Sequence, residues 1–199
     1  MLNIAVFVSG GGTNLQALLD AQAKGEIKNG KISLVMGSKN GIYALERAKN
    51  AGVKTAVVEK KTFENAEMFE TALCNVLEEN NIGLIVLAGY LTILSSSFTA
   101  KYKRKIINVH PSLIPSFCGE GFYGLKVHEA ALAKGVKVTG ATVHFVNEVP
   151  DGGEIILQKA VEVLPNDTAE TLQKRVMENA EWSLLPKAVS LFCEGKLEK

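Results

Sequence analysis

Apolar positions in the first half of the chain follow two alternating patterns. Short continuous apolar runs rich in Val and Ile are typical of strands buried on both faces, as in a parallel sheet. Between these runs, apolar residues recur at helical spacing. The runs that predict strands lie at 2–8, 31–36, 53–58, 83–88 and 105–109. A first helix is predicted directly after residue 14, and further helices are predicted over 41–51, 63–80 and 97–103. This alternation predicts right-handed crossovers and a parallel sheet.

The pattern changes after residue 110. Residues 112–124 form a loop with Pro, Gly and aromatic residues, and a loop of this length is often a functional lid. A helix over 126–133 and two strands over 136–146 and 155–163, joined through an Asp-Gly turn, come next. A final helix over 169–194 is expected to kink or split at Pro186. We therefore expect one α/β domain: a Rossmann-like open, mostly parallel twisted sheet with helices on both faces and an antiparallel hairpin near the C-terminal end.

Three loops follow predicted strands directly. Ligands of open parallel sheets bind beyond the carboxyl ends of the strands. The loops at 9–14, 89–94 and 108–124 all start at such ends. We therefore expect them to share one edge of the sheet.

The strand over 105–109 ends in an amide and an imidazole two positions apart. Residues i and i+2 of a strand point to the same face, so Asn108 and His110 should project together. Pro111 restricts His110 to extended or turn conformations. An amide can hold a developing oxyanion, and a histidine can move a proton near neutral pH. The alternative is a plain strand end, with an Asn that caps a turn and a packed His.

The first strand leads into Ser9-Gly10-Gly11-Gly12-Thr13-Asn14 and then a helix. Glycine amides and a helix N-terminus together suit a phosphate group. The loop lacks the Lys of a Walker motif and does not match Gly-x-Gly-x-x-Gly, which disfavours ATP and dinucleotides. The alternative is a tight turn in which Thr13 or Asn14 caps the helix, and both interpretations are compatible.

Composition narrows the class of protein. Among 199 residues the formal net charge is +1, so no strong field favours a nucleic acid or a membrane as partner. The three cysteines are widely spaced and fit a reducing compartment, and the chain starts in a strand without a positive leader, so we expect a cytoplasmic protein. The three histidines lack metal-ligand spacing, and no metal is expected.

Asp151 lies in the Asp-Gly turn, where catalytic carboxylates often occur, although a plain turn aspartate is the alternative. Beside His110 it is expected to raise the histidine pKa. No Gly-x-Ser-x-Gly motif is present and no cysteine has a reactive context. An Asn, a His and an Asp without a nucleophile suggest that the substrate itself attacks, through a tetrahedral intermediate.

Four motifs together resemble the folate-dependent formyltransferases almost from end to end. The motifs are the glycine loop at 9–14, Leu-Ala-Gly-Tyr-Leu at 87–91, Asn-Val-His-Pro-Ser-Leu-Ile-Pro at 108–115 and His-Phe-Val-x-x-x-x-Asp-Gly-Gly at 144–153. The N-terminal motif is similar to that of the branch that acts on phosphoribosylglycinamide in purine biosynthesis. The resemblance implies one formyltransferase domain over 1–199, which moves a formyl group from 10-formyltetrahydrofolate, as co-substrate, to the amine of 5-phosphoribosylglycinamide. It implies no further partner and a monomer or homodimer.

The resemblance also implies roles for residues. Asn108, His110 and Asp151 would be the catalytic trio, and His144 mainly a structural neighbour. The ribonucleotide would bind to Gly12, Thr13, Asn14 and Glu181. The folate would bind to Leu91, Thr92, Ile93, Leu94, Asn108, Asn147 and Asp151.

This chain departs from the family's usual pattern at several positions. Thr92 and Ala66 stand where the family often has basic residues, which leaves Lys60 or Lys61 as candidates for the folate tail. The helix around Glu181 carries one extra residue. The hydrolases of the same family are longer chains than this one. The family members that act on tRNA would need a more basic charge than this chain carries. A noncatalytic nucleotide-binding module would keep the glycine loop without the trio.

Overall fold

The computed structural model describes residues 1–197. Its strands are β1 (Leu2–Val8), β2 (Gly30–Gly37), β3 (Lys54–Val57), β4 (Ile82–Leu87), β5 (Ile106–His110), β6 (Val138–Phe145) and β7 (Ile155–Glu162). Its helices are α1 (Thr13–Ala23), α2 (Tyr43–Asn50), α3 (Ala66–Glu79), α4 (Ser96–Lys101), α5 (Leu125–Lys134), α6 (Ala169–Val176) and α7 (Trp182–Cys193). A 3-10 turn, η1 (Lys60–Thr62), and a π-helical turn, η2 (Met177–Glu181), complete the described elements.

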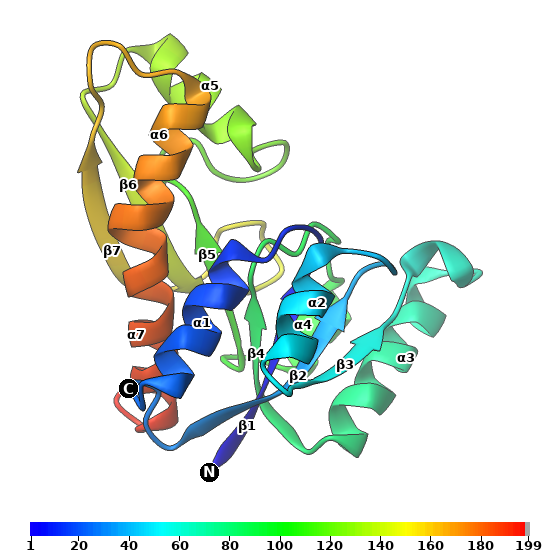
Figure 1. Ribbon diagram of the computed structural model, residues 1–199. Helices are drawn as coiled ribbons and strands as arrows, with labels where there is room; N and C mark the ends of the chain where they lie inside the picture. Colours follow the sequence, from blue (N-terminus) through cyan, green and yellow to red (C-terminus); the bar gives the residue numbers. More distant parts are fainter. Residues whose placement is uncertain (198–199) are drawn as a thin grey trace.

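The strands form one sheet in the order β3-β2-β1-β4-β5-β6-β7 (Figure 1). The pairs from β3 to β5 are parallel, and β6 and β7 add antiparallel strands. The predicted fold class is thus confirmed. The chain leaves β1 toward β2 and β3 and then returns to the other side with β4, so the strand order switches direction beside β1. Loops diverge at such a point and leave a crevice for a ligand.

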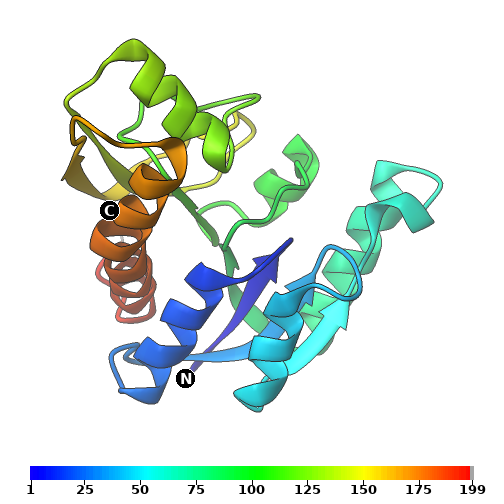
Figure 2. The same cartoon turned by 45° about the horizontal axis from the view of Figure 1, so that its top comes forward.

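The alternating residues of β1 explain why this strand is apolar throughout. Ile4, Val6 and Val8 belong to a core beneath α1, α2, α6 and α7. Ala5 and Phe7 belong to a second core beneath α3 and α4. Figures 1 and 2 show these helices as layers on the two faces of the sheet. Burial on both faces fixes the carboxyl end of β1, and with it the glycine loop.

The long C-terminal helix is divided at η2, and Pro186 lies inside α7, so the expectation that the helix splits at Pro186 was wrong. Residues Leu172, Val176, Ala180, Leu184 and Ala188 all belong to the same core. In an α-helix, a step of four residues exceeds one full turn by about 40°, so residues spaced four apart would gradually rotate away from the core. The wider η2 turn absorbs that drift. Pro186 is accommodated because the hydrogen bond that it lacks would reach back only to Trp182, the first residue of α7.

Within residues 1–197, no helix combines the length and the apolar character that a membrane span requires.

Candidate active site

Asn108, His110 and Asp151 meet at the carboxyl-terminal half of β5. The two strand residues come from alternate positions of β5, and Asp151 comes from the loop that joins β6 to β7. His110 Nδ1 lies 3.3 Å from Asp151 Oδ2, and Asn108 Nδ2 lies 3.5 Å from Asp151 Oδ1. Phe145, the last residue of β6, pairs with Ile107 near the start of β5, and the following loop folds back to bring Asp151 to Asn108 and His110. Residues more than forty positions apart in sequence therefore form one cluster.

His110 is buried, and its ring orientation is fixed from the opposite side. Nε2 lies 2.8 Å from the backbone oxygen of Phe117, which assigns the proton of the neutral ring to Nε2. Nδ1, which faces Asp151, is therefore the nitrogen that gains or loses a proton. Burial lowers the pKa of His110 below its ordinary value, although Asp151 and the Phe117 carbonyl both raise it. Asp151 thus raises the His110 pKa as expected, but the loss of hydration outweighs this attraction.

Asp151 is held as a carboxylate by its neighbours. Burial raises its pKa, but the neighbouring His144 and His110 rings and the Gly119 amide outweigh burial, so the pKa lies below its ordinary value. The Gly119 N–H donates to Oδ2 over 2.9 Å. Asp151 has a φ of 55°, a left-handed conformation that Asp adopts more easily than most residues. The turn thereby directs the carboxylate toward both imidazoles.

His144 supports the Asn108 amide. Its Nδ1 lies 2.8 Å from the Phe145 backbone oxygen, so that nitrogen carries the proton of the neutral ring. Its Nε2 then accepts a hydrogen bond from Asn108 Nδ2 over 3.2 Å. Nε2 also lies 3.5 Å from Asp151 Oδ1. The N–H end of the Asn108 amide is thus directed into the cluster.

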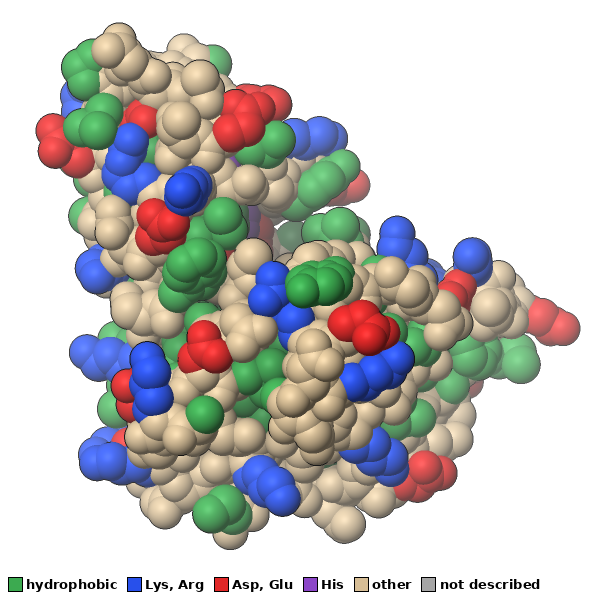
Figure 3. Space-filling view, viewed as in Figure 1, with side chains coloured by type: hydrophobic (Ala, Val, Ile, Leu, Met, Phe, Trp, Pro, Cys, Tyr) green, Lys and Arg blue, Asp and Glu red, His purple; other side chains and the backbone are tan. Residues whose placement is uncertain are grey.

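Two cavities open onto this cluster and share six of their lining residues. The larger, about 530 Å³, reaches from the 119–124 loop to Asn14 and Glu181. The smaller, about 140 Å³, lies between the 91–94 segment and the 146–151 loop. The residues common to both are Tyr90, Leu91, Ile93, Asn108, Pro150 and Asp151. In Figure 3 the surface is hollowed between the part that carries α5 and α6 and the part that carries α2, and histidine colour is visible in the hollow.

The expected folate residues surround the smaller cavity. Leu91, Thr92, Ile93, Leu94 and Asn147 all line it, together with Asn108 and Asp151. Leu91 and Ile93 are 62% and 67% exposed, which is high for aliphatic side chains and leaves an apolar surface for a flat ligand. The expectation that the 9–14, 89–94 and 108–124 loops share one edge is therefore confirmed by the larger cavity.

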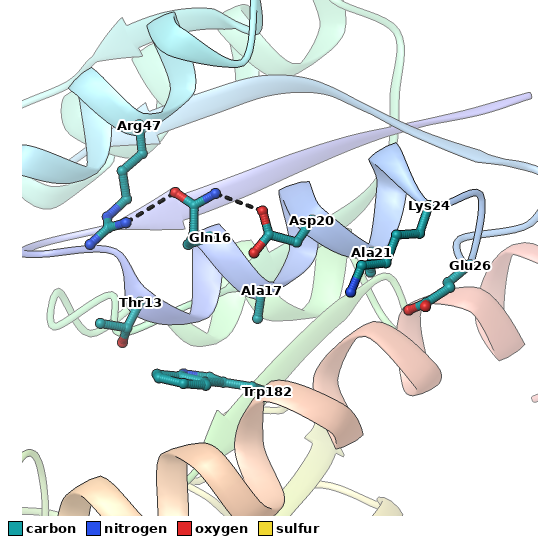
Figure 4. Close-up of a pocket in the computed structure, with 9 residues that line it drawn as sticks. All are labelled: Thr13, Gln16, Ala17, Asp20, Ala21, Lys24, Glu26, Arg47 and Trp182. Atoms are coloured by element: carbon teal, nitrogen blue, oxygen red, sulfur yellow. Dashed lines mark hydrogen bonds between the residues drawn. The ribbon is translucent and has the colours of Figure 1, made fainter.

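The residues expected to bind the ribonucleotide are divided between two cavities. Asn14 and Glu181 line the larger cavity, and Asn14 Nδ2 donates to Glu181 Oε2 over 2.6 Å. Thr13 lines a neighbouring cavity of about 310 Å³ between α1 and α7 (Figure 4). Gly12 lies at the turn between them, with a φ of 74°.

Neither Thr13 nor Asn14 caps α1, so the capping role expected for them in a tight turn was wrong. The N-cap is Gly12, and no side chain accepts a hydrogen bond there. A Cβ on Gly12 would lie 2.7 Å from the Cβ of Ala44. The position requires glycine for both its left-handed conformation and this close approach. Within residues 1–197 the amides of Gly11, Gly12 and Thr13 donate no hydrogen bond to the protein, and they remain free to bind an anion.

Glu181 is buried, and burial raises its pKa to about 7, although the Asn14 hydrogen bond lowers it. It is the last residue of the η2 turn. The other amide atom of its partner, Asn14 Oδ1, is buried without a hydrogen-bond partner among the described residues. The pair therefore has an unused acceptor at the end of the larger cavity.

Several groups that shape the site carry no signal in the sequence. The Phe117 carbonyl and the Gly119 amide are backbone groups, which every residue has. His144 was expected only as a structural neighbour, but it lies against both Asn108 and Asp151. Its alternation with Thr142 along β6 was the available signal. In residues 1–197, no group of three or more His, Cys, Asp or Glu side chains is arranged to hold a metal ion.

Comparison with known proteins agrees with this geometry. The sequence model of the family described as "Formyl transferase" matches residues 2–189. The phosphoribosylglycinamide formyltransferase of Haemophilus influenzae is 41% identical over 197 residues, which cover 99% of this chain and 90% of that protein. The crystal structure of glycinamide ribonucleotide transformylase 1 from Symbiobacterium toebii has a TM-score of 0.93 at 40% identity, covering 100% of this chain and 91% of that one.

Other relatives are much longer. The trifunctional purine biosynthetic protein adenosine-3 of Gallus gallus is 43% identical over 197 residues, covering 99% of this chain and 19% of that protein. The chain thus spans about a fifth of the length of these trifunctional relatives. With its cluster at the strand ends and a match along nearly its whole length, the chain belongs to the formyl transferase family.

Proposed function

We propose that this chain transfers the formyl group of 10-formyltetrahydrofolate to the amine of 5-phosphoribosylglycinamide, a step of purine biosynthesis. The observation that carries the proposal is the cluster of Asn108, His110 and Asp151 between two cavities. It provides hydrogen-bond donors and a proton acceptor at the point where two small molecules can meet. The names of the Haemophilus influenzae and Symbiobacterium toebii proteins support the same ribonucleotide acceptor and the transfer of a formyl group.

Nearby hydroxyl and thiol groups are poor nucleophiles, which supports direct transfer. The Ser112 hydroxyl is buried and donates to the Ser116 carbonyl over 2.5 Å. The Cys118 thiol donates to the Pro115 carbonyl. Burial, and to a smaller extent the negative charge of Asp151, raises the pKa of this thiol. A thiol with a raised pKa provides little thiolate at neutral pH. The attacking group is therefore the substrate's own amine.

In the proposed reaction the amine nitrogen attacks the formyl carbon, and the carbonyl oxygen becomes an oxyanion. The N–H of Asn108, directed into the cluster by His144, stabilises that oxyanion. The pair formed by His110 Nδ1 and Asp151 Oδ2 accepts the proton that the amine loses. The bond between the formyl carbon and N10 then breaks, and the same proton returns to N10. Atoms and charge balance without an additional nucleophile or a metal ion.

The substrates are proposed to enter from opposite ends. The ribonucleotide lies along the larger cavity, with its phosphate at the free amides of Gly12 and Thr13 and its ribose near Asn14 and Glu181. The pterin lies between the Leu91–Leu94 segment and the loop from Asn147 to Asp151. Their reactive ends then meet at Asn108, which lines both cavities.

The proposed unit is one formyltransferase domain over residues 1–199, cytoplasmic and active as a monomer or homodimer. Its partners are the two small molecules alone, with no role for a nucleic acid or a membrane. The net charge of +1 supports this restriction, since a protein that binds nucleic acid usually carries a strong basic field.

One assay separates the candidate activities. The protein is mixed with glycinamide ribonucleotide and 10-formyltetrahydrofolate, and the products are separated, identified and quantified by mass spectrometry. Formyl-glycinamide ribonucleotide in amounts equal to the tetrahydrofolate released is the expected result. Formate without a formylated ribonucleotide would indicate a hydrolase. The absence of turnover, together with binding of the ribonucleotide, would indicate a noncatalytic module and contradict the proposal.

A further inference from the structure

Arg47 of α2 is a charged residue beside the glycine loop that neither the sequence motifs nor the proposed reaction assigns. Its Nε donates to the backbone oxygen of Gly11 over 2.8 Å, and its Nη1 donates to Gln16 Oε1 over 3.0 Å. The guanidinium carbon also lies 4.8 Å from the centre of the Tyr43 ring. All three contacts are neutral. The positive charge is therefore available to an anion that binds at the loop.

The orientation of Arg47 is fixed through α1. Gln16 Nε2 donates to Asp20 Oδ1 over 2.8 Å, which leaves the Gln16 oxygen turned toward Arg47. Figure 4 shows this series of hydrogen bonds along one wall of the cavity, with Arg47 and Thr13 at the same end and Trp182 on the opposite wall. The guanidinium is thus held at the end of the cavity that borders the glycine loop.

The contact with Gly11 determines where a loop amide points. In a trans peptide the C=O and the following N–H point in opposite directions. Arg47 holds the Gly11 carbonyl on the side of α2, so the N–H of Gly12 points away from α2. Ala44 acts in the same way on the preceding peptide, because its N–H donates to the Gly10 carbonyl over 3.1 Å. Two consecutive amides are thereby turned to one side of the loop.

We propose that Arg47 is a positioning residue for the phosphate of the ribonucleotide, because it orients the Gly12 amide through the Gly11 carbonyl and adds a positive charge at the loop. The inference rests on the proposed function and makes it more specific. In this proposal, Arg47 is the residue that makes the protein prefer a phosphorylated over an unphosphorylated substrate. A lysine at this position keeps the charge but has no fixed N–H at the place of Nε, so it is not an equivalent replacement.

The test compares Arg47→Met and Arg47→Lys with the unchanged protein on two substrates, glycinamide ribonucleotide and the riboside that lacks the phosphate. The control is Lys49→Met, which removes an exposed cation from the same helix. For Arg47→Met we expect KM for the ribonucleotide to rise about tenfold to a hundredfold. The values of kcat, KM for 10-formyltetrahydrofolate and kcat/KM for the riboside should stay within about twofold. On a logarithmic scale, Arg47→Lys should raise KM for the ribonucleotide by at least half as much as Arg47→Met does.

Three results would overturn the inference: an equal loss on both substrates, no loss on either, or full recovery in Arg47→Lys. Equal loss would make Arg47 a purely structural residue, and full recovery would leave charge as its only contribution. A second measurement does not depend on turnover: inorganic phosphate should raise the unfolding temperature of the unchanged protein and of Lys49→Met more than that of either Arg47 variant. If the unchanged protein binds phosphate through Arg47 but forms no formylated product, the proposed reaction fails while the role of Arg47 in anion binding stands.

Discussion

The buried pair of Glu181 and Asn14 gives a prediction about stability as well as binding. Glu181 is to be replaced by Gln, which has the same shape and still accepts the hydrogen bond from Asn14 Nδ2. The change removes one titrating group from the interior and little else. Any difference in pH dependence between the two proteins therefore reports on Glu181.

The size of the effect follows from burial. The folded state raises the pKa of Glu181 from 4.5 to about 7, which corresponds to about 3 kcal/mol. Because the folded state holds the proton more tightly, this stabilisation is fully present below pH 4.5. It is lost as the pH rises through 7, where the native protein must bury a charged carboxylate. Relative to Glu181→Gln, the natural protein should therefore lose about 3 kcal/mol of stability between pH 4.5 and pH 8.

The assay is urea unfolding of both proteins at several pH values between 4.5 and 8.5, without ligand, so that the difference in free energy of unfolding is obtained at each pH. Glu178→Gln is the matched control, since Glu178 lies in the same η2 turn but is exposed. Its difference from the natural protein should stay within about 0.5 kcal/mol across the range. If the curves for the natural protein and Glu181→Gln run parallel, Glu181 is not buried in its charged form above pH 7, and the reasoning fails.

Three further substitutions test the site. Asp151→Asn should lower kcat by about 10²- to 10⁴-fold with little change in unfolding temperature, because Asn also tolerates a φ of 55°; kcat and thermal unfolding are measured. Thr13→Asp should raise KM for the ribonucleotide at least about tenfold by repulsion of the phosphate, with KM for the folate unchanged. Gly12→Ala should lower the free energy of unfolding by about 1–3 kcal/mol in urea, because its Cβ would lie 2.7 Å from the Ala44 Cβ at a φ of 74°.

Each of these has its own control and its own contradicting result. Near-normal turnover in Asp151→Asn would remove Asp151 from the proton transfer. Thr13→Asn is the uncharged match for Thr13→Asp, and equal KM values for the two variants would show that charge is not the cause. Gly25→Ala has a similar φ of 72° but no atom within 4 Å of the added Cβ. If Gly12→Ala and Gly25→Ala lower the free energy of unfolding equally, the left-handed backbone conformation alone explains the loss, and the close approach to Ala44 contributes nothing.

Local patterns were sufficient for the architecture and for the position of the site. The apolar run of β1 predicted a strand buried on both faces, and Ile4 and Phe7 do lie in opposite cores. Spacing within β5 was enough to place Asn108 beside His110, because alternation along a strand is a local property. Such features depend on neighbouring residues, so they are readable from the chain alone.

Other features depend on groups that are far apart in sequence. Asn14 and Glu181 are 167 positions apart, and only packing of α1 against the C-terminal helices brings them together. The end of α6 was misplaced because the signal of Pro186 is local, whereas η2 arises from the need to keep Ala180 and Leu184 on one core. The net lowering of the His110 pKa could not be predicted, because the sequence shows a charged neighbour but not the extent of burial.

The sequence alone thus determined the order of strands and helices, the edge of the sheet that carries the site, and the absence of a protein nucleophile from its motifs. The tertiary structure decided the direction of the His110 pKa shift, the support of Asn108 by His144 and the contact of Arg47 with Gly11. The physical reason is that periodicity records which face of an element is buried. Charge states and amide orientations depend on the summed field and hydrogen bonds of residues from several elements.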